Sequence, residues 1–212
     1  MNTNSGDPAP YSTSPVVVAW FTKHYVTRGV RVVVGDRSFW GDHDTMGNLE
    51  RNGIAPAARR AGAEVVAFET NTTRWIELDP RDVPSWKPPI RVPALAFEAD
   101  QLINLACAKT HFITGVTLGL KNMLGLVCAD DRAREGNLRS HDPARIHQQI
   151  AELHRAITIG LTVIDGFDAL VTGGPTPRSG APPTIVRTGV VLASRDAQAV
   201  EAQGRALLQR YG

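Results

Sequence analysis

Four of the expected strands end in polar residues, and one of these ends reads Lys-Thr-His. Lys109 and His111 are two residues apart, so on an extended backbone their side chains point to the same side. We expect a helix from Thr114 to about Val127, which places Thr114, Thr117 and Lys121 along one stripe. A strand end followed by a helix N-terminus favours negative charge, because free N–H groups and the helix dipole point at it. The pattern predicts a carboxylate or phosphate site, with Lys109 and Lys121 holding the anion and His111 moving a proton.

Two acids are expected in the same crevice. Asp36 ends the valine-rich strand of residues 30–34, and Asp165 ends a strand over residues 161–164. Ligands of parallel sheets bind at the carboxyl ends of the strands, so Asp36 and Asp165 would orient the substrate or a metal there. The alternative is structural: Lys109 and Lys121 are then solvated, and His111 only caps the turn.

Two groups of residues have the types, but not the spacing, of a metal site. Asp42, His43 and Asp44 are adjacent, and three adjacent residues rarely chelate one ion, so we favour a turn that leads into the next helix. His147 and His154 are seven apart on one helix, roughly 10 Å along its axis, so with His141 they favour a solvated helix face. Neither group therefore predicts a metal site.

The chain has two cysteines, Cys107 and Cys128, and neither belongs to a CxxC pair. This excludes an iron–sulfur cluster or zinc site built from four cysteines within this chain, and it indicates a reduced, cytoplasmic setting. Buried free thiols are expected, and a redox pair stays open if the two meet in space. The glycines of residues 173–174 form neither GxGxxG nor a Walker loop, so the cofactor is unknown.

Length and composition limit the class of protein. The chain has 212 residues, a net charge of +2, 42% hydrophobic and 21% charged residues, which is typical of one globular domain over residues 1–212. The small charge and the lack of a Lys/Arg run exclude a dedicated nucleic-acid binder. The longest apolar run, Val16 to Phe21, is too short for a membrane span, and the polar first 15 residues argue against a secretory signal.

Helices and strands are expected to alternate almost throughout. We expect helices over residues 15–28, 46–61, 114–127, 143–157 and 197–210, and strands over 30–34, 64–68, 102–108, 161–164 and 187–193. Residues 69–93 contain five prolines and two tryptophans, which predict an irregular, packed excursion. The order predicts an α/β fold with a Rossmann-like, layered and largely parallel sheet flanked by helices.

The stretch from Ile103 to Val127, INLACAKTHFITGVTLGLKNMLGLV, resembles the hallmark of the domain of unknown function 362 family. Members commonly have a strand, then K-T-H, then L-K-N and a glycine, here Gly125. Further matches are VVVGDRS, EAD, TVIDGF, GGP and VVLASRDAQAV. The resemblance adds Thr110 and Asn122 to the expected substrate-binding residues. It also implies that this chain is truncated by one N-terminal strand, and that a redox setting is possible, since some members carry ferredoxin-like cluster domains.

Three functions follow from these patterns. The first is an enzyme, or enzyme component, that binds a small anionic metabolite, with His111 and Lys109 catalytic and the other residues binding substrate: Thr110, Thr117, Lys121, Asn122, Asp36 and Asp165. The second is a non-catalytic redox or metal-handling partner of an iron–sulfur protein, which needs an exposed apolar patch. The third is a binding module without turnover. No nucleic-acid or membrane partner is expected.

Overall fold

The computed structural model describes residues 5–38, 44–138, 142–178 and 180–212. The first unit joins α1 (Pro15–Val26), β1 (Val33–Asp36), α2 (Thr45–Arg51), α3 (Ile54–Arg60) and β2 (Glu64–Ala67). Ser14 caps α1 through its side chain, which accepts from the Val16 N–H, and Pro15 opens the helix as expected. β1 and β2 pair in parallel. The helix expected over 46–61 is two helices, because Gly53 takes a positive φ of 83° between them.

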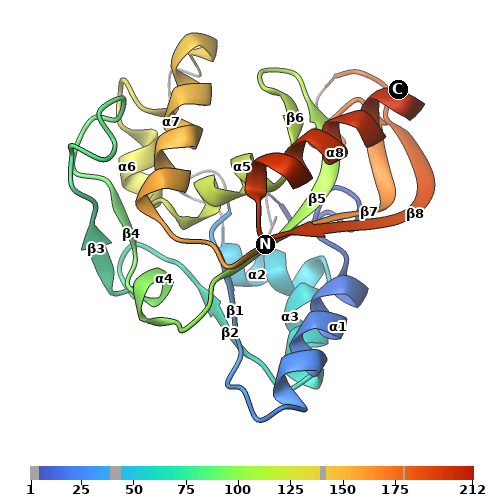
Figure 1. Cartoon of the computed structure of the whole chain (residues 1–212), viewed down its shortest axis with the longest axis horizontal. Helices are drawn as coiled ribbons and strands as arrows, with labels where there is room; N and C mark the ends of the chain where they lie inside the picture. The colour runs from blue at the N-terminus through green and yellow to red at the C-terminus, as the bar shows by residue number, and fades with distance from the viewer. Residues whose placement is uncertain (1–4, 39–43, 139–141, 179) are drawn as a thin grey trace.

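The second unit contains the proline-rich residues, which are more regular than expected. β3 (Trp75–Glu77) and β4 (Arg91–Pro93) pair antiparallel, and α4 (Leu95–Glu98) follows them. Together with α6 (Ala129–Ala133) and α7 (Pro143–Ala156) they form the left side of Figure 1. Trp86 is buried, and its indole N–H donates to the carbonyl of Gln149 on α7. The excursion is thus part of a core cluster that α7 covers.

The third unit is a four-stranded sheet in the order β6-β5-β7-β8, with α8 (Ala197–Tyr211) packed on one face (Figure 1). Its strands are β5 (Ile103–His111), β6 (Gly115–Thr117), β7 (Leu161–Thr172) and β8 (Thr184–Ser194). Only β5 and β7 run parallel; the other two pairs are antiparallel hairpins. The α/β class is therefore correct. The described residues form sheets of mixed orientation and not a largely parallel one, and a Rossmann-like layered sheet is not confirmed.

The helix expected over residues 114–127 is wrong. The chain turns at Gly115, which has a positive φ of 74°, and returns as β6. Two short helices follow, α5 (Gly119–Asn122) and the 3-10 helix η1 (Met123–Leu126). The β-branched residues Val116 and Thr117 favour a strand, and the glycines at 119 and 125 weaken a longer helix.

Two expected strand ends also lie inside strands. β5 continues to His111 and β7 to Thr172, so Lys109 and Asp165 are interior positions. The pairing register shifts between Cys107 and Lys109 on β5, and again between Gly166 and Asp168 on β7. Bulges of this kind re-aim the side chains beside them. The site is therefore built around bulged strands in the middle of the sheet.

The two longest helices in the described residues are α7 and α8, with 14 and 15 residues. No helix in these ranges is long and apolar enough to cross a membrane.

Candidate functional site

Lys109 lies inside the protein, at 1% exposure. Its ammonium donates a hydrogen bond of 2.5 Å to the carbonyl of Tyr11, in the segment that precedes α1. The same segment crosses β5 again where the Thr13 hydroxyl donates to the Leu105 carbonyl at 3.0 Å. Burial lowers the pKa of Lys109, and the nearby carboxylates of Asp36 and Asp7 oppose this shift. Lys109 is therefore not the solvated lysine of the structural alternative.

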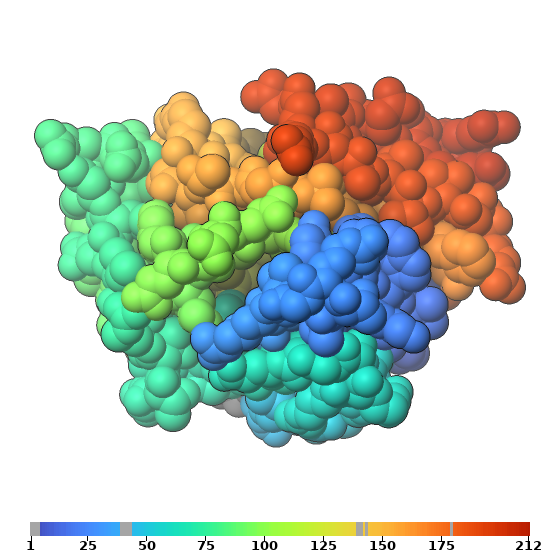
Figure 2. Space-filling view, turned by 60° about the horizontal axis from the view of Figure 1, so that its bottom comes forward, coloured from blue at the N-terminus to red at the C-terminus, as the bar shows by residue number. Residues whose placement is uncertain are grey.

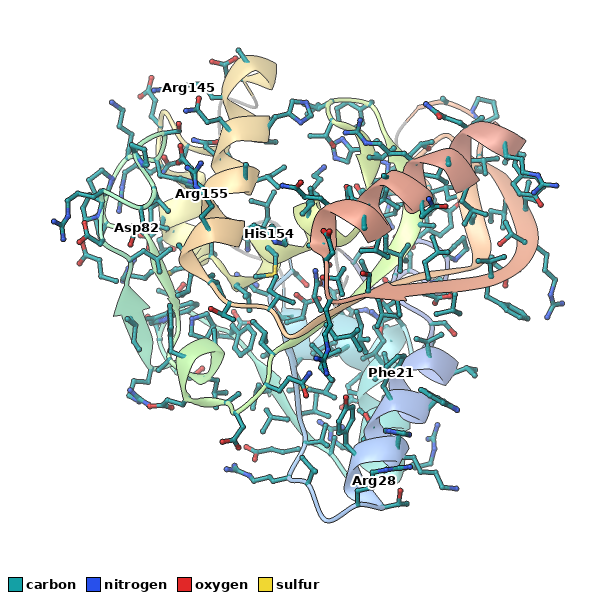
Figure 3. The ribbon with its side chains drawn as sticks, in the orientation of Figure 1. Phe21, Arg28, Asp82, Arg145, His154 and Arg155 are labelled. Carbon is teal, nitrogen blue, oxygen red and sulfur yellow. The ribbon has the colours of Figure 1, made fainter. Side chains whose placement is uncertain are left out.

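Lys121 is partly buried on α5, and its position is set by its neighbours. Asn104 donates to the Gly119 carbonyl at 2.8 Å, and Glu201 of α8 accepts from the Leu120 N–H at 3.0 Å. His154, labelled on α7 in Figure 3, makes a hydrogen bond of 3.2 Å with the Leu120 carbonyl. These contacts hold the helix backbone on both sides of Lys121.

The environment of Lys121 changes its protonation. Desolvation by burial, followed by the positive charge of Lys109, lowers the pKa of Lys121 to about 6. The Lys121 side chain makes no hydrogen bond or ion pair within the described ranges. The side chain is thus an amine that is largely neutral at pH 7, beside a second buried lysine.

Asp36 ends β1 as expected and reaches the same region. A Cβ added at Gly125 of η1 would lie 2.5 Å from the Asp36 carboxylate, so β1 and η1 meet here. The Asp36 charge acts on Lys109 and on Arg132, and Arg132 also feels Arg37. Both arginines are buried, and burial lowers the pKa of Arg132 to about 9. The sequence patterns did not single out either arginine.

We call Arg37, Lys109, Lys121 and Arg132 the cationic cluster. Arg37 has an ion pair of 3.4 Å with Glu69 and donates to Thr45, while Arg132 donates to the Ser38 carbonyl at 2.7 Å. Buried charges are costly unless opposite charge is near. Asp36 acts on Lys109 and Arg132, Asp7 also acts on Lys109, and Glu69 pairs with Arg37, so acids of the protein compensate part of the cluster's charge.

Thr117 supplies a hydroxyl next to Lys109. The two residues are register partners across the β5–β6 hairpin, so their side chains share one face of the sheet. Thr117 is 4% exposed, and its Oγ1 has no hydrogen-bond partner among the described residues. A buried hydroxyl without a partner is unusual in a folded protein and is typical of a position that a ligand or water fills.

The helix N-terminus expected to hold the anion has a different role. α5 has only four residues, and its Leu120 N–H is occupied by the Glu201 carboxylate. Burial raises the pKa of Glu201, and the N–H groups of Leu120 and Gly119 lower it in part. The protein's own acid therefore fills this position. Glu201 was missed because it lies 81 residues further along the chain.

His111 and Thr110 take part in local structure. His111 Nδ1 accepts from the N–H groups of Ile113 and Thr114, which is the turn cap of the structural alternative. Thr110 accepts from the Gly174 N–H, and a Cβ at Gly174 would lie 2.1 Å from the Thr110 carbonyl oxygen. The Lys-Thr-His segment is thus the end of a strand and not a turn, and proton transfer by His111 stays a prediction.

Asn122 is buried and forms bonds within the fold. Its amide donates to Asn104 Oδ1 at 2.7 Å and to the Leu105 carbonyl at 3.3 Å. These contacts tie α5 to β5 and so help to place Lys121. A direct role for Asn122 in substrate binding stays a prediction.

Asp165 lies on β7 beside Cys107, its register partner on β5. Its carboxylate accepts from the N–H groups of Ser14 and Phe167, and burial raises its pKa. Burial also raises the pKa of the Cys107 thiol, the Lys109 charge opposes this, and Asp165 adds to it. The Cys107 thiol is thus within electrostatic reach of both Asp165 and Lys109, and a role for Asp165 in the lysine site stays a prediction. Cys107 and Cys128 are both buried and free.

Asp165 also lines a separate, mostly apolar pocket of about 620 Å³ between α1 and the β7–β8 hairpin. Trp20 and Phe21 line it from α1, and Phe167 and Val191 from the strands. Figure 2 shows this face, with α1 in blue beside the orange and red residues, and Figure 3 labels Phe21. Trp20 is 61% exposed. An exposed apolar surface of this kind is what the redox-partner hypothesis requires. Binding of an iron–sulfur protein stays a prediction.

The expected turn before α2 is confirmed at Asp44, whose carboxylate accepts from the Gly47 N–H. Asp42, His43 and His141 lie outside the described residues. His147 is exposed, but His154 is partly buried against α5, so a solvated helix face is wrong for His154. Within the described ranges no three His, Cys, Asp or Glu side chains are grouped to hold a metal.

Comparison with known sequences places the chain in a family. It is similar to the thylakoid-associated protein sll1697 of Synechocystis sp. (strain ATCC 27184 / PCC 6803 / Kazusa), with 28% identity over 189 residues. This alignment covers 89% of the chain and 54% of the relative, so the chain spans about half the length of that protein. Residues 1–205 match the model of the family described as domain of unknown function (DUF362), and the chain therefore belongs to this family.

Proposed function

We propose that the protein is an enzyme, or a component of one, that binds a small anionic molecule between Lys109 and Lys121. The observation that carries the proposal is the burial of two lysines on elements that pack together: Lys109 is 1% exposed on β5, and Lys121 is partly buried on α5, which Asn104 and Asn122 tie to β5. A bound anion stabilises the charged form of both amines, so it compensates part of the cost of burying them.

The surrounding groups support an oxyanion ligand. Arg37 and Arg132 add positive charge near Asp36, and the Thr117 hydroxyl offers a hydrogen bond beside Lys109. Ammonium groups and hydroxyls donate hydrogen bonds that carboxylate and phosphate oxygens accept. The proposed ligand is therefore a small carboxylate or phosphate that contacts Lys109, Lys121 and Thr117.

A thermal-shift panel tests this proposal. The probes are inorganic phosphate, oxalate and pyruvate, applied to the parent protein, to Lys121→Ala and to Lys87→Ala, whose lysine is exposed. Binding to the folded state raises the melting temperature. We expect at least one probe to stabilise the parent and Lys87→Ala, and to stabilise Lys121→Ala less. Equal shifts in all three proteins, or no shift in any, would contradict the proposal.

A further inference from the structure

Lysine is scarce in this chain, and half of the lysines meet at one place. The sequence has four lysines among its 23 basic residues, and the remainder are arginines. Lys23 and Lys87 are exposed, whereas Lys109 and Lys121 lie together inside the site. Arginine keeps its charge when buried, but lysine gives up its proton readily and then acts as a base or nucleophile. The presence of lysine and not arginine at these two positions therefore favours a reactive amine over a residue that only supplies positive charge.

We propose that Lys121 condenses with the carbonyl carbon of a small 2-oxo acid, whose carboxylate lies against Lys109 and Thr117. The inference rests on the proposed function, since it places the same anion in the same site. It goes further by assigning a covalent step to one lysine and a ligand class, a carboxylate next to a ketone or aldehyde.

The surroundings of Lys121 suit a nucleophilic amine. Its backbone is held by Asn104, Glu201 and His154, so the side chain has a defined origin. Burial and the neighbouring charge of Lys109 keep the amine largely neutral at pH 7, and only the neutral amine has the lone pair that attacks a carbonyl. A lysine beside another cation in a desolvated site is a known way to prepare such a nucleophile.

Lys109 and Thr117 suit the carboxylate of the same molecule. Lys109 is fixed by its hydrogen bond to the Tyr11 carbonyl, and Thr117 has a buried hydroxyl with no partner in the described part of the chain. These are two hydrogen-bond donors on one face of the hairpin, and α5, which carries Lys121, is tied to the same strand through Asn104 and Asn122. A 2-oxo acid places its carboxylate and its carbonyl carbon on adjacent atoms, so one small molecule reaches both lysines.

The step balances without a further reactant. The lone pair of Lys121 Nζ forms the N–C bond, and the electron pair of the carbonyl π bond moves to oxygen, giving a carbinolamine after proton transfer from nitrogen to oxygen. The second N–H proton and the hydroxyl then leave as water, and the C=N bond forms. The amine and the 2-oxo acid are thereby converted to an imine and one water, with no change of oxidation state.

Reduction with borohydride tests this proposal directly. The full chain is incubated with pyruvate, treated with sodium borohydride, and analysed by intact mass and peptide mapping. We expect one reduced adduct on Lys121. Lys23 and Lys87 are exposed controls in the same chain, and Lys121→Arg keeps a cation but cannot form an imine. Loss of the adduct in Lys121→Arg supports the proposal.

Three results would overturn it: no adduct on the parent, an adduct confined to Lys23 or Lys87, or an equal adduct in Lys121→Arg. Oxalate separates this failure from failure of the proposed function, because it offers carboxylates but no ketone or aldehyde carbon. If oxalate stabilises the parent and pyruvate leaves no adduct, the anion site stands and the imine is refuted. If oxalate, phosphate and pyruvate all fail to stabilise the parent and no adduct forms, both proposals are refuted.

Discussion

Lys109 and Thr117 are partners across the β5–β6 hairpin, and together they place a buried ammonium beside a buried hydroxyl. The hairpin turns at Gly115, and the chain then leads directly into α5 and Lys121. A short piece of chain therefore brings two amines and a hydroxyl to one place.

The pH dependence of anion binding follows from Lys121. Its pKa is lowered to about 6 by burial and by Lys109, while the Asp36 charge acts on both Lys109 and Arg132. A bound anion raises the pKa of Lys121. The affinity for the anion is therefore greatest below about pH 6, where the free protein is also protonated. It falls as the pH rises from there to the higher pKa of Lys121 in the complex. Calorimetry of oxalate in buffers of different ionisation enthalpy should show proton uptake at about pH 7.

Imine formation has the opposite dependence, since it needs the neutral amine. The yield of reduced pyruvate adduct should rise as pH increases through about 6, where Lys121 loses its proton. Parallel trends for oxalate affinity and adduct yield would contradict the assignment of both to Lys121.

The free energy of unfolding should also depend on pH through Lys121. In the unfolded chain Lys121 has the ordinary lysine pKa of 10.5, and in the folded protein it has a pKa of about 6. Between these values the unfolded state holds more protons, so the parent's free energy of unfolding rises with pH across that window. Lys121→Met lacks this group, so its gain in stability over the parent should be largest at about pH 6 and shrink toward about pH 10. Urea unfolding over this range checks it, and a gain that is constant with pH would count against the burial of Lys121.

Asn122→Ala distinguishes a positioning role from ligand contact. The change removes hydrogen bonds to Asn104 Oδ1 and to the Leu105 carbonyl, and it leaves buried polar atoms without these partners. We expect a loss of about 1–3 kcal/mol in the free energy of unfolding, together with weaker oxalate binding. Chemical denaturation and calorimetry measure the two effects. Weaker binding with unchanged stability would instead identify Asn122 as a direct ligand contact.

The sequence predicted those parts of the fold whose signals are local. Ser14-Pro15 starts α1, Pro143 opens α7, and the start of α8 was placed at Ala197. The hairpin at Gly115 was missed because apolar residues at spacings of three and four also fit a helix. Gly115 adopts a positive φ, which fits the hairpin and not a continuous helix. A periodicity pattern contains no information on this backbone angle.

The same limits apply to the candidate site. Asp36, Lys109, His111, Lys121 and Asp165 were expected to line one crevice. The Asp36 charge acts on Lys109, and the Lys109 charge acts on Lys121. His111 accepts hydrogen bonds from the hairpin turn, and the joint crevice of all five residues stays a prediction. Tyr11 and Glu201 were missed because they reach Lys109 and α5 from 98 and 81 residues away. Contacts over such separations depend on tertiary packing and leave no local pattern.

The central claim is that Lys121 contributes to an anion site, and calorimetric titration of parent and Lys121→Ala tests it most directly. The probe is the anion among phosphate, oxalate and pyruvate that most raises the melting temperature of the parent. The account predicts that the variant folds and binds more weakly by about 1.5–3 kcal/mol, the size of a hydrogen bond to a charged group. Lys87→Ala should bind as the parent does, because Lys87 is exposed. Equal affinities for the parent and Lys121→Ala would contradict the account.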